Sequence, residues 1–209
     1  IPDYVITGDV YINATLTIEP GVVIHVKENH AFYVNKGGAI ESKGTSTEKI
    51  VFTSANEIGD IYWKGIMIKS SSSTNLLDYT EIKYAGNSNL AFSGTDYATA
   101  VGIEDGKLSI TNSKISNSKA YGLFLHSGEI NDFAQNAFEQ NQDYSIRLNA
   151  SQVGKLDDAT TFSDAGSAVL IYNSSLGEAS EVSWPALNGG ARYFVEGWLY
   201  VDSYLSISA

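Results

Sequence analysis

A repeat of 23 to 24 residues within Leu108–Leu148 constrains the fold of this chain more than any other feature. The equivalent pairs are Asn112 and Asn136, Asn117 and Asn141, Tyr121 and Tyr144, and Leu125 and Leu148. Short alternating segments of this period, punctuated by Asn and Gly, are the signature of a solenoid. Because one such unit cannot bury its apolar face alone, successive units must stack strand on strand.

Short segments with apolar residues at alternate positions run through the rest of the chain. They include Val10–Ile12, Val22–Val26, Phe32–Val34, Ile50–Phe52 and Ala168–Tyr172. Period-two alternation indicates strands with one buried face, and the sequence between them predicts no long amphipathic helix. A β-sandwich would give a similar strand spacing, but the 23-to-24-residue recurrence favours a coil whose turns stack about 4.8 Å apart.

The repeat also predicts which side chains are buried and which segments are exposed. Asn suits the corners of a coil, because it tolerates left-handed backbone and its side chain can hydrogen-bond along a stack. We expect Ser70–Thr74 to form an exposed turn and Asn87–Thr99 to form a protruding loop. The residues expected to point inward are Ile110, Ile115, Leu123, Leu125, Ile146 and Leu148.

A second, longer similarity links the two ends of the chain. Tyr4–Ile18 aligns with Tyr193–Ile207 over 15 positions without a gap, at a constant offset of 189 residues. We interpret residues 1–190 as one β-helix module and residues 191–209 as the opening turn of a second copy, stacked on the same coil. Residues 193–209 should then be β-strand in register with the coil. The chain begins at Ile1 rather than Met, so we expect a processed product or an excised piece. Because the second copy stops before its turn is complete, we expect the natural protein to continue past Ala209.

Several motifs between about residues 4 and 150 are similar to those of a known family. They are Leu16–Ile24, Gly44-Thr45 with Ile50–Ser54, Trp63–Ile66, and Asn75–Tyr79 with Ile82–Gly86. These motifs resemble bacterial right-handed parallel β-helix repeat proteins of the pectin-lyase-like superfold, which are mostly secreted or surface proteins and are frequent in Bacteroidetes. Repeat and resemblance together predict an all-β, right-handed single-stranded parallel β-helix (solenoid) with roughly 22–24 residues per turn. The resemblance says little about activity, because the group includes lyases, hydrolases and proteins with no known catalysis.

Composition excludes several kinds of partner and site. The net charge of −11 disfavours nucleic acid and anionic polysaccharides, because an acidic surface repels both. The chain has no Cys, and therefore no disulfide, thiolate metal site or Cys nucleophile. No apolar run approaches the ~20 residues of a membrane span, so we expect no membrane insertion.

The sequence does not assemble a recognisable catalytic constellation. Lyases of the group that this chain resembles need a basic cluster, whereas Arg147 and Arg192 stand apart from other cations. Arg147 occupies the repeat position of Phe124, from which we expect it to point outward. Hydrolases of the group cluster Asp residues near a His-Gly pair, but no such pair follows Asp157-Asp158. Glu104–Gly106 is typical of a turn.

Metal binding and ice binding find little support in the sequence. His25, His30 and His126 are too scattered for a zinc site. We predict no cofactor, and weak Ca²⁺ binding by loop carboxylates stays open and unlocated. The Thr residues do not keep one period, as a flat ice-binding array would require.

Aromatic rings are the candidate ligand-binding groups. Tyr62, Trp63, Tyr79 and Tyr84 could stack against the C–H faces of sugars, or they could pack within the sheets as aromatic ladders. Because stacked β-helices have filled interiors, we expect a sugar to contact exposed rings of Tyr62, Tyr79 or Tyr84 on an outer face rather than a deep pocket.

Our hypothesis is a non-catalytic structural or adhesive module of a larger secreted or cell-surface bacterial protein, with glycan binding on an outer face. Its partners would be neighbouring β-helix modules of the same protein and surface or host polysaccharide. The alternative is a polysaccharide-degrading enzyme, either a glycoside hydrolase or a lyase, of the pectin-lyase-like group. The sequence leaves open the ligand, the number of modules and the oligomeric state.

Overall fold

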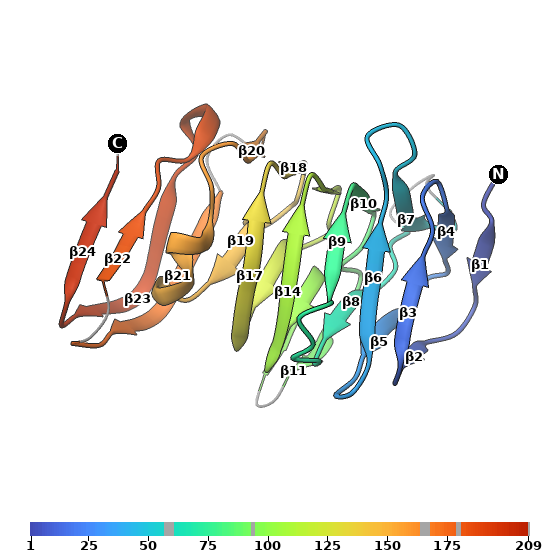
Figure 1. Cartoon of the computed structure of the whole chain (residues 1–209), viewed down its shortest axis with the longest axis horizontal. Helices are drawn as coiled ribbons and strands as arrows, with labels where there is room; N and C mark the ends of the chain where they lie inside the picture. Colours follow the sequence, from blue (N-terminus) through green and yellow to red (C-terminus); the bar gives the residue numbers. More distant parts are fainter. Residues whose placement is uncertain (57–60, 93–94, 164–167, 179–180, 209) are drawn as a thin grey trace.

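Three parallel sheets form the walls of an elongated coil in the computed structural model, which describes residues 1–208 except 57–60, 93–94, 164–167 and 179–180 (Figure 1). Sheet A contains β1 (Tyr4–Ile6), β4 (Val23–Val26), β7 (Ile50–Ser54), β10 (Thr80–Lys83), β15 (Lys114–Ser116), β18 (Ala137–Glu139) and β20 (Thr161–Phe162). Sheet B contains β2 (Val10–Ile12), β5 (Ala31–Val34), β8 (Gly65–Ile68), β13 (Thr99–Ile103), β16 (Tyr121–Leu125), β19 (Ile146–Leu148), β21 (Val169–Leu176) and β23 (Tyr193–Val201). Sheet C contains β3 (Thr15–Ile18), β6 (Ala39–Lys43), β9 (Leu76–Asp78), β14 (Gly106–Thr111) and β17 (Gly128–Ala134).

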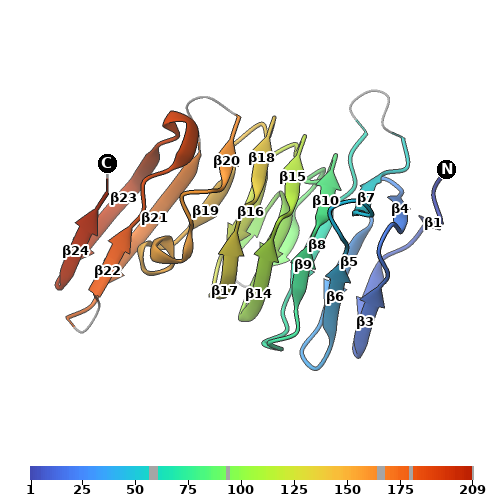
Figure 2. The same cartoon turned by 45° about the horizontal axis from the view of Figure 1, so that its top comes forward.

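The chain visits the sheets in a constant order, A then B then C, and then rises to the next turn. Near the C-terminus, short 3₁₀ helices replace strands at two places, η1 (Ala150–Lys155) on the face of sheet C and η2 (Asn188–Gly190) on that of sheet A. Beyond η1, β22 (Glu181–Trp184) and β24 (Tyr204–Ile207) continue the face of sheet C, as Figure 2 shows. The two termini lie at opposite ends of the stack. This architecture confirms the predicted parallel β-helix.

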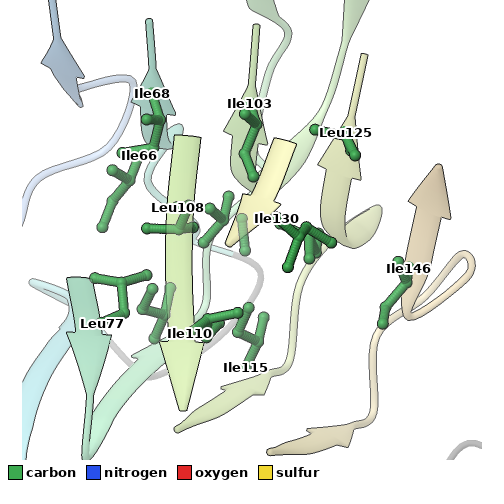
Figure 3. Close-up of a cluster of buried hydrophobic side chains, with 14 of the residues drawn as sticks. Ile66, Ile68, Leu77, Ile103, Leu108, Ile110, Ile115, Leu125, Ile130 and Ile146 are labelled. Carbon is green, nitrogen blue, oxygen red and sulfur yellow. The ribbon is translucent and has the colours of Figure 1, made fainter. Parts of the chain in front are cut away.

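The interior of the coil is filled with aliphatic and aromatic side chains. The alternation of each strand turns every second residue inward, so like residues stack from one turn to the next. Figure 3 shows Ile68, Ile103 and Leu125 of sheet B, which stack in this way on successive turns. The six residues predicted to point inward are each no more than 1% exposed, which confirms them: Ile110, Ile115, Leu123, Leu125, Ile146 and Leu148.

The length of a turn follows the prediction except where loops are inserted. Val101, Leu123 and Ile146 stack directly above one another, at steps of 22 and 23 residues. The steps from Phe32 to Ile66 and from Ile66 to Val101 are 34 and 35 residues long. The second of these long turns contains the antiparallel hairpin of β11 (Leu90–Phe92) and β12 (Thr95–Tyr97).

That hairpin corrects the expectation of a protruding loop at Asn87–Thr99. Leu90 and Phe92 are buried, and the ring centroid of Phe92 lies 4.9 Å from that of Phe124 on the outer side of sheet B. The hairpin therefore packs on the coil.

The sequence alignment that matches Asn112 with Asn136 and Asn117 with Asn141, at an offset of 24 residues, is wrong by one position. Ile115 pairs with Phe138, so the offset in the sheet is 23. The left-handed corner residues are Asn112 and Asn117 in one turn and Gln135 and Gln140 in the next. Asn136 and Asn141 are the equivalents of Ser113 and Ser118, and their side chains do bond along the stack, since their Oδ1 atoms accept hydrogen bonds from the Ser113 and Ser118 amides at 3.0 and 3.2 Å.

The last turn stacks on the coil, as the end-to-end similarity predicts. β23 pairs with β21 in parallel, and β24 pairs with β22. The start of the alignment differs between the two ends, however, because Tyr4–Ile6 lies in sheet A and Tyr193–Val195 in sheet B. The assignment of residues 191–209 to a second module stays a prediction.

Candidate functional site

The outer side of sheet A carries charged side chains that pair with one another. Lys49 Nζ lies 2.8 Å from Glu81 Oε1, and Lys114 pairs with Glu139 one turn on. Exposed pairs of this kind contribute little to stability. Their mutual neutralisation leaves this face without concentrated charge that would attract a charged ligand.

The outer side of sheet B is apolar and largely covered. Met67, Phe124 and the hairpin residues Leu90 and Phe92 form a buried cluster against which Tyr33, Tyr97, Tyr121 and Tyr172 pack. Burial raises the pKa of Tyr172 above its usual value, although the neighbouring Arg147 cation opposes the shift. The hydroxyl of Tyr172 donates to the carbonyl oxygen of His126 at 2.9 Å.

Arg147 points outward from β19, as its equivalence to Phe124 predicts, but it enters this cluster instead of solvent. Its guanidinium carbon lies 4.2 Å from the ring centroid of Tyr97 and 4.5 Å from that of Tyr172. Among the described residues, Arg147 makes one ion pair, a long contact of 3.9 Å between Nη2 and Glu196 Oε2. The buried Nε and Nη1 atoms of Arg147 have no hydrogen-bond partner. The aromatic rings therefore supply most of its stabilisation.

The four aromatic residues that the sequence suggests for sugar stacking do not form one exposed face. Trp63 is fully buried in the core, where its Nε1 donates to the carbonyl oxygen of Lys83 at 2.8 Å. Tyr62 is also buried, against the ring of Tyr84. Tyr79 and Tyr84 are half-buried at opposite ends of β10, both with left-handed backbone. The ring of Tyr62 is thus not exposed, contrary to our expectation, and Trp63 packs in the core, the alternative that the sequence left open. Tyr79 and Tyr84 keep part of their surface in contact with solvent.

The outer side of sheet C contains a groove of about 760 Å³ with polar and apolar lining residues, which we call the sheet-C groove. In Figure 2 its strands, β3, β6, β9, β14 and β17, lie side by side. The residues that line it are Thr17, Ile18, Glu19, Pro20, Glu41, Lys43, Gly44, Thr45, Ser73, Thr74, Leu76, Ser109, Thr111 and Asp132. Its volume is in the range of sites that bind small molecules.

The floor of the groove is one column of neighbouring side chains on successive turns. Thr17 pairs with Glu41, Glu41 with Leu76, and Leu76 with Ser109. A neighbouring column contains Asp78, whose Oδ1 accepts hydrogen bonds from Thr111 Oγ1 at 2.8 Å and from Asn112 Nδ2 at 2.9 Å.

A β-bulge places the last carboxylate of the floor. Leu108 pairs with Ile130 and Ile110 with Phe133, so Ser109 faces two residues of β17, Asn131 and Asp132. Bulges redirect side chains and are common next to functional sites. Asp132 is exposed, and its Oδ2 accepts a hydrogen bond from Ser109 Oγ at 3.0 Å.

One wall of the groove depends on a close backbone approach. Gly44 donates its amide to the carbonyl oxygen of Asp78 at 2.9 Å, and a Cβ atom at Gly44 would lie 2.6 Å from the carbonyl oxygen of Tyr79. Only glycine permits this contact without displacement of the chain. The Gly44-Thr45 segment can therefore lie close beside the floor.

The carboxylates considered for catalysis are placed in structural roles. Asp157 accepts hydrogen bonds from the amide of Gln135 at 2.8 Å and from the hydroxyl of Thr160. Glu104 is buried and pairs with Lys69 at 2.8 Å. Neither is part of the sheet-C groove.

The described residues contain neither a group of metal-ligating side chains nor a helix that could span a membrane. Among them, no three His, Asp or Glu side chains are grouped closely enough to hold a metal ion. In the same residues, no helix is long and apolar enough to cross a bilayer.

The groove was not found from the sequence because its floor comes from five separate strands. Thr17 and Asp132 are 115 positions apart, and only the register of the coil brings them to one face. The alternation within each strand did indicate which residues face outward. Adjacent residues of a strand point to opposite faces, and an inward-facing residue stands next to each of Thr17, Glu41, Leu76 and Ser109.

A comparison with protein families supports the architecture. Residues 2–105 match the family model described as pectate-lyase like beta helix domain. No curated protein and no solved structure gives a significant match. The family match and the stacked parallel sheets together identify the chain as a parallel β-helix, similar over its first half to the pectate-lyase like β-helix domain.

Proposed function

We propose that this chain is a non-catalytic structural and adhesive module of a secreted or cell-surface protein, and that it binds glycans on an outer face of the coil. The sheet-C groove is the observation that carries the proposal. The interior is filled, sheet B is largely covered between its two ends, and sheet A carries paired charges, whereas sheet C presents a hollow of about 760 Å³.

The spacing of the two floor carboxylates, Glu41 and Asp132, does not suit a catalytic pair. Glu41 and Asp132 lie on β6 and β17, three turns apart, which corresponds to about 14 Å along the stack. Glycosidases of the two-carboxylate type place the pair roughly 5 to 9.5 Å apart. A sugar chain could contact both residues at once, but one glycosidic bond could not lie between them.

The structural part of the proposal rests on how the last turn ends. Val195, Trp198, Tyr200 and Tyr204 are large apolar or aromatic side chains with exposed surface on β23 and β24. Exposed strand edges with apolar side chains tend to pair with further strands. A neighbouring β-helix module of the same protein is the partner that we propose for this edge.

Affinity electrophoresis through gels that contain different polysaccharides tests the proposal. We expect retardation in at least one neutral polysaccharide, with no new reducing ends and no unsaturated products after prolonged incubation. Turnover detected by either assay would support the polysaccharide-degrading alternative. Free migration in every gel, without turnover, would contradict glycan binding.

A further inference from the structure

We propose that the sheet-C groove binds an extended, uncharged polysaccharide whose chain runs along the coil axis from β3 to β17. This inference rests on the proposed function and names the ligand class, the site and the direction of binding. It places the ligand on the outer side of sheet C, in a groove that neither Tyr79 nor Tyr84 lines.

The direction follows from the arrangement of polar groups. The floor residues occupy equivalent positions on five successive strands, Thr17, Glu41, Leu76, Ser109 and Asp132. Neighbouring strands are about 4.8 Å apart, so the floor extends for about 19 Å. The spacing between neighbouring strands is close to the length of one pyranose unit in an extended chain. A chain parallel to the axis would present a similar sugar to each strand.

The side chains of the floor suit a polyhydroxylated ligand. Thr17 offers an exposed hydroxyl, whereas the hydroxyls of Thr111 and of the buried Ser109 already donate to Asp78 and Asp132. Glu41 and Asp132 offer carboxylate oxygens that accept hydrogen bonds from sugar hydroxyls. Leu76 lies half-exposed in the middle of the column. It gives an apolar surface for the C–H face of a ring.

The charge of the groove excludes acidic chains. Three carboxylates line it, on Glu19, Glu41 and Asp132, against the single ammonium group of Lys43. The whole chain also carries a net charge of −11. Uronate or sulfate groups would be repelled both locally and at a distance, so a neutral chain is favoured.

The walls of the sheet-C groove leave room for a ligand that lies along the coil axis. The turns at Glu19-Pro20 and Gly44-Thr45 line one part of the groove, and the loop residues Ser73 and Thr74 line another. Both Ser73 and Thr74 are exposed. Thr74 and Thr45 can therefore contact a bound chain without a change in the coil.

Isothermal titration calorimetry with neutral β-linked oligosaccharides of increasing length tests the proposal. We expect affinity to rise up to about five sugar units, one for each strand of the floor, and then to level off. E41Q and D132N should each weaken the binding of the longest ligand about tenfold or more, because each loses a charged acceptor. T17R should abolish it, because a long side chain at this exposed position fills one end of the groove.

Two matched variants control for effects elsewhere. E139Q changes a carboxylate on the outer side of sheet A, and Y84A removes the half-exposed ring suggested by the sequence, so both should bind like the wild type. Thermal melts show that each variant is folded. If E41Q, D132N and T17R all bind with wild-type affinity, the sheet-C groove is not the binding site, although the protein still binds glycans. If Y84A loses binding, the ligand lies at Tyr84 instead.

Charged ligands distinguish recognition from simple attraction. Polygalacturonate oligosaccharides should not bind. If only chitosan oligosaccharides bind, and high salt removes that binding, the neutral-chain proposal is wrong. If no glycan of any kind binds the wild type, the proposed function fails together with this inference.

Discussion

The guanidinium carbon of Arg147 lies 4.2 Å from the ring centroid of Tyr97, although the two residues belong to different layers of the molecule. Arg147 comes from the wall of the coil and Tyr97 from the hairpin of β11 and β12. The cation also faces Phe124 and Tyr172 at 4.9 and 4.5 Å. Arg147 thus joins the hairpin to sheet B through its contacts with aromatic rings.

Replacement of Arg147 by Ala should lower the free energy of unfolding by about 2–4 kcal/mol, because it removes both packing and cation–π contacts. Arg147→Met should stay within about 1 kcal/mol of the wild type, because it fills the space and removes a buried charge with two unpaired donors. Urea unfolding measures both changes. A Met variant as unstable as the Ala variant would show that the charge itself holds the hairpin.

The core prediction concerns Leu125, which is fully buried in β16. Leu125→Ala should lower the free energy of unfolding by about 2–5 kcal/mol, as a cavity in a close-packed interior does. Val5→Ala, at an exposed strand position, should cost less than about 1 kcal/mol. Equal losses in the two variants, measured by urea unfolding, would contradict the inward register.

Asn136 tests the polar ladder inside the coil. Its Oδ1 accepts from the Ser113 amide at 3.0 Å and its Nδ2 donates to the carbonyl oxygen of Ile110 at 2.9 Å, with the side chain almost fully buried. Asn136→Ala removes one partner from each of these two backbone groups and the buried side-chain bonds with them, and should cost about 2–4 kcal/mol. Asn13→Ala removes an exposed side-chain bond to Asn35 and should cost less than about 0.5 kcal/mol. Thermal unfolding of the two variants gives the comparison, and similar melting temperatures would refute the ladder.

Tyr193 should make stability depend on alkaline pH. Burial raises the pKa of its phenol, whose hydroxyl donates to the carbonyl oxygen of Pro185 at 2.8 Å. The unfolded chain loses this proton near pH 10, before the folded chain does. The contribution of Tyr193 is therefore fully present below about pH 10 and declines above it. Urea unfolding between pH 8 and 11 should show a steeper alkaline loss in the wild type than in Tyr193→Phe, and parallel curves would contradict the assignment.

The fold could be predicted because its determinants are local and repeated. Ile115 and Ile146 alternate with polar residues, and the period of the repeat leaves a stacked coil as the arrangement that buries both of them. The exact register could not be predicted from residue type alone. Gln135 takes the left-handed corner that Asn112 takes one turn earlier, so matching Asn with Asn gave an offset of 24 where the sheet has 23.

The candidate site could be predicted only in part. Placement of a ligand on an outer face follows from the filled interior, but the individual rings do not reveal their burial: Trp63 looks the same in sequence whether it faces solvent or the core. The hairpin over sheet B and the enclosure of Arg147 depend on contacts between layers, which no periodicity records. The bulge that directs Asp132 into the groove is likewise invisible until β14 and β17 are paired.

Native mass spectrometry of the protein after overnight incubation with a neutral pentasaccharide tests the central claim most directly, because one spectrum reports both binding and turnover. A non-catalytic glycan-binding module should appear as free protein and as a one-to-one complex whose added mass is that of the intact pentasaccharide. The complex should be depleted in T17R and retained in E139Q. Shortened or unsaturated sugars in the spectrum, or a wild-type protein with no bound sugar, would contradict the account.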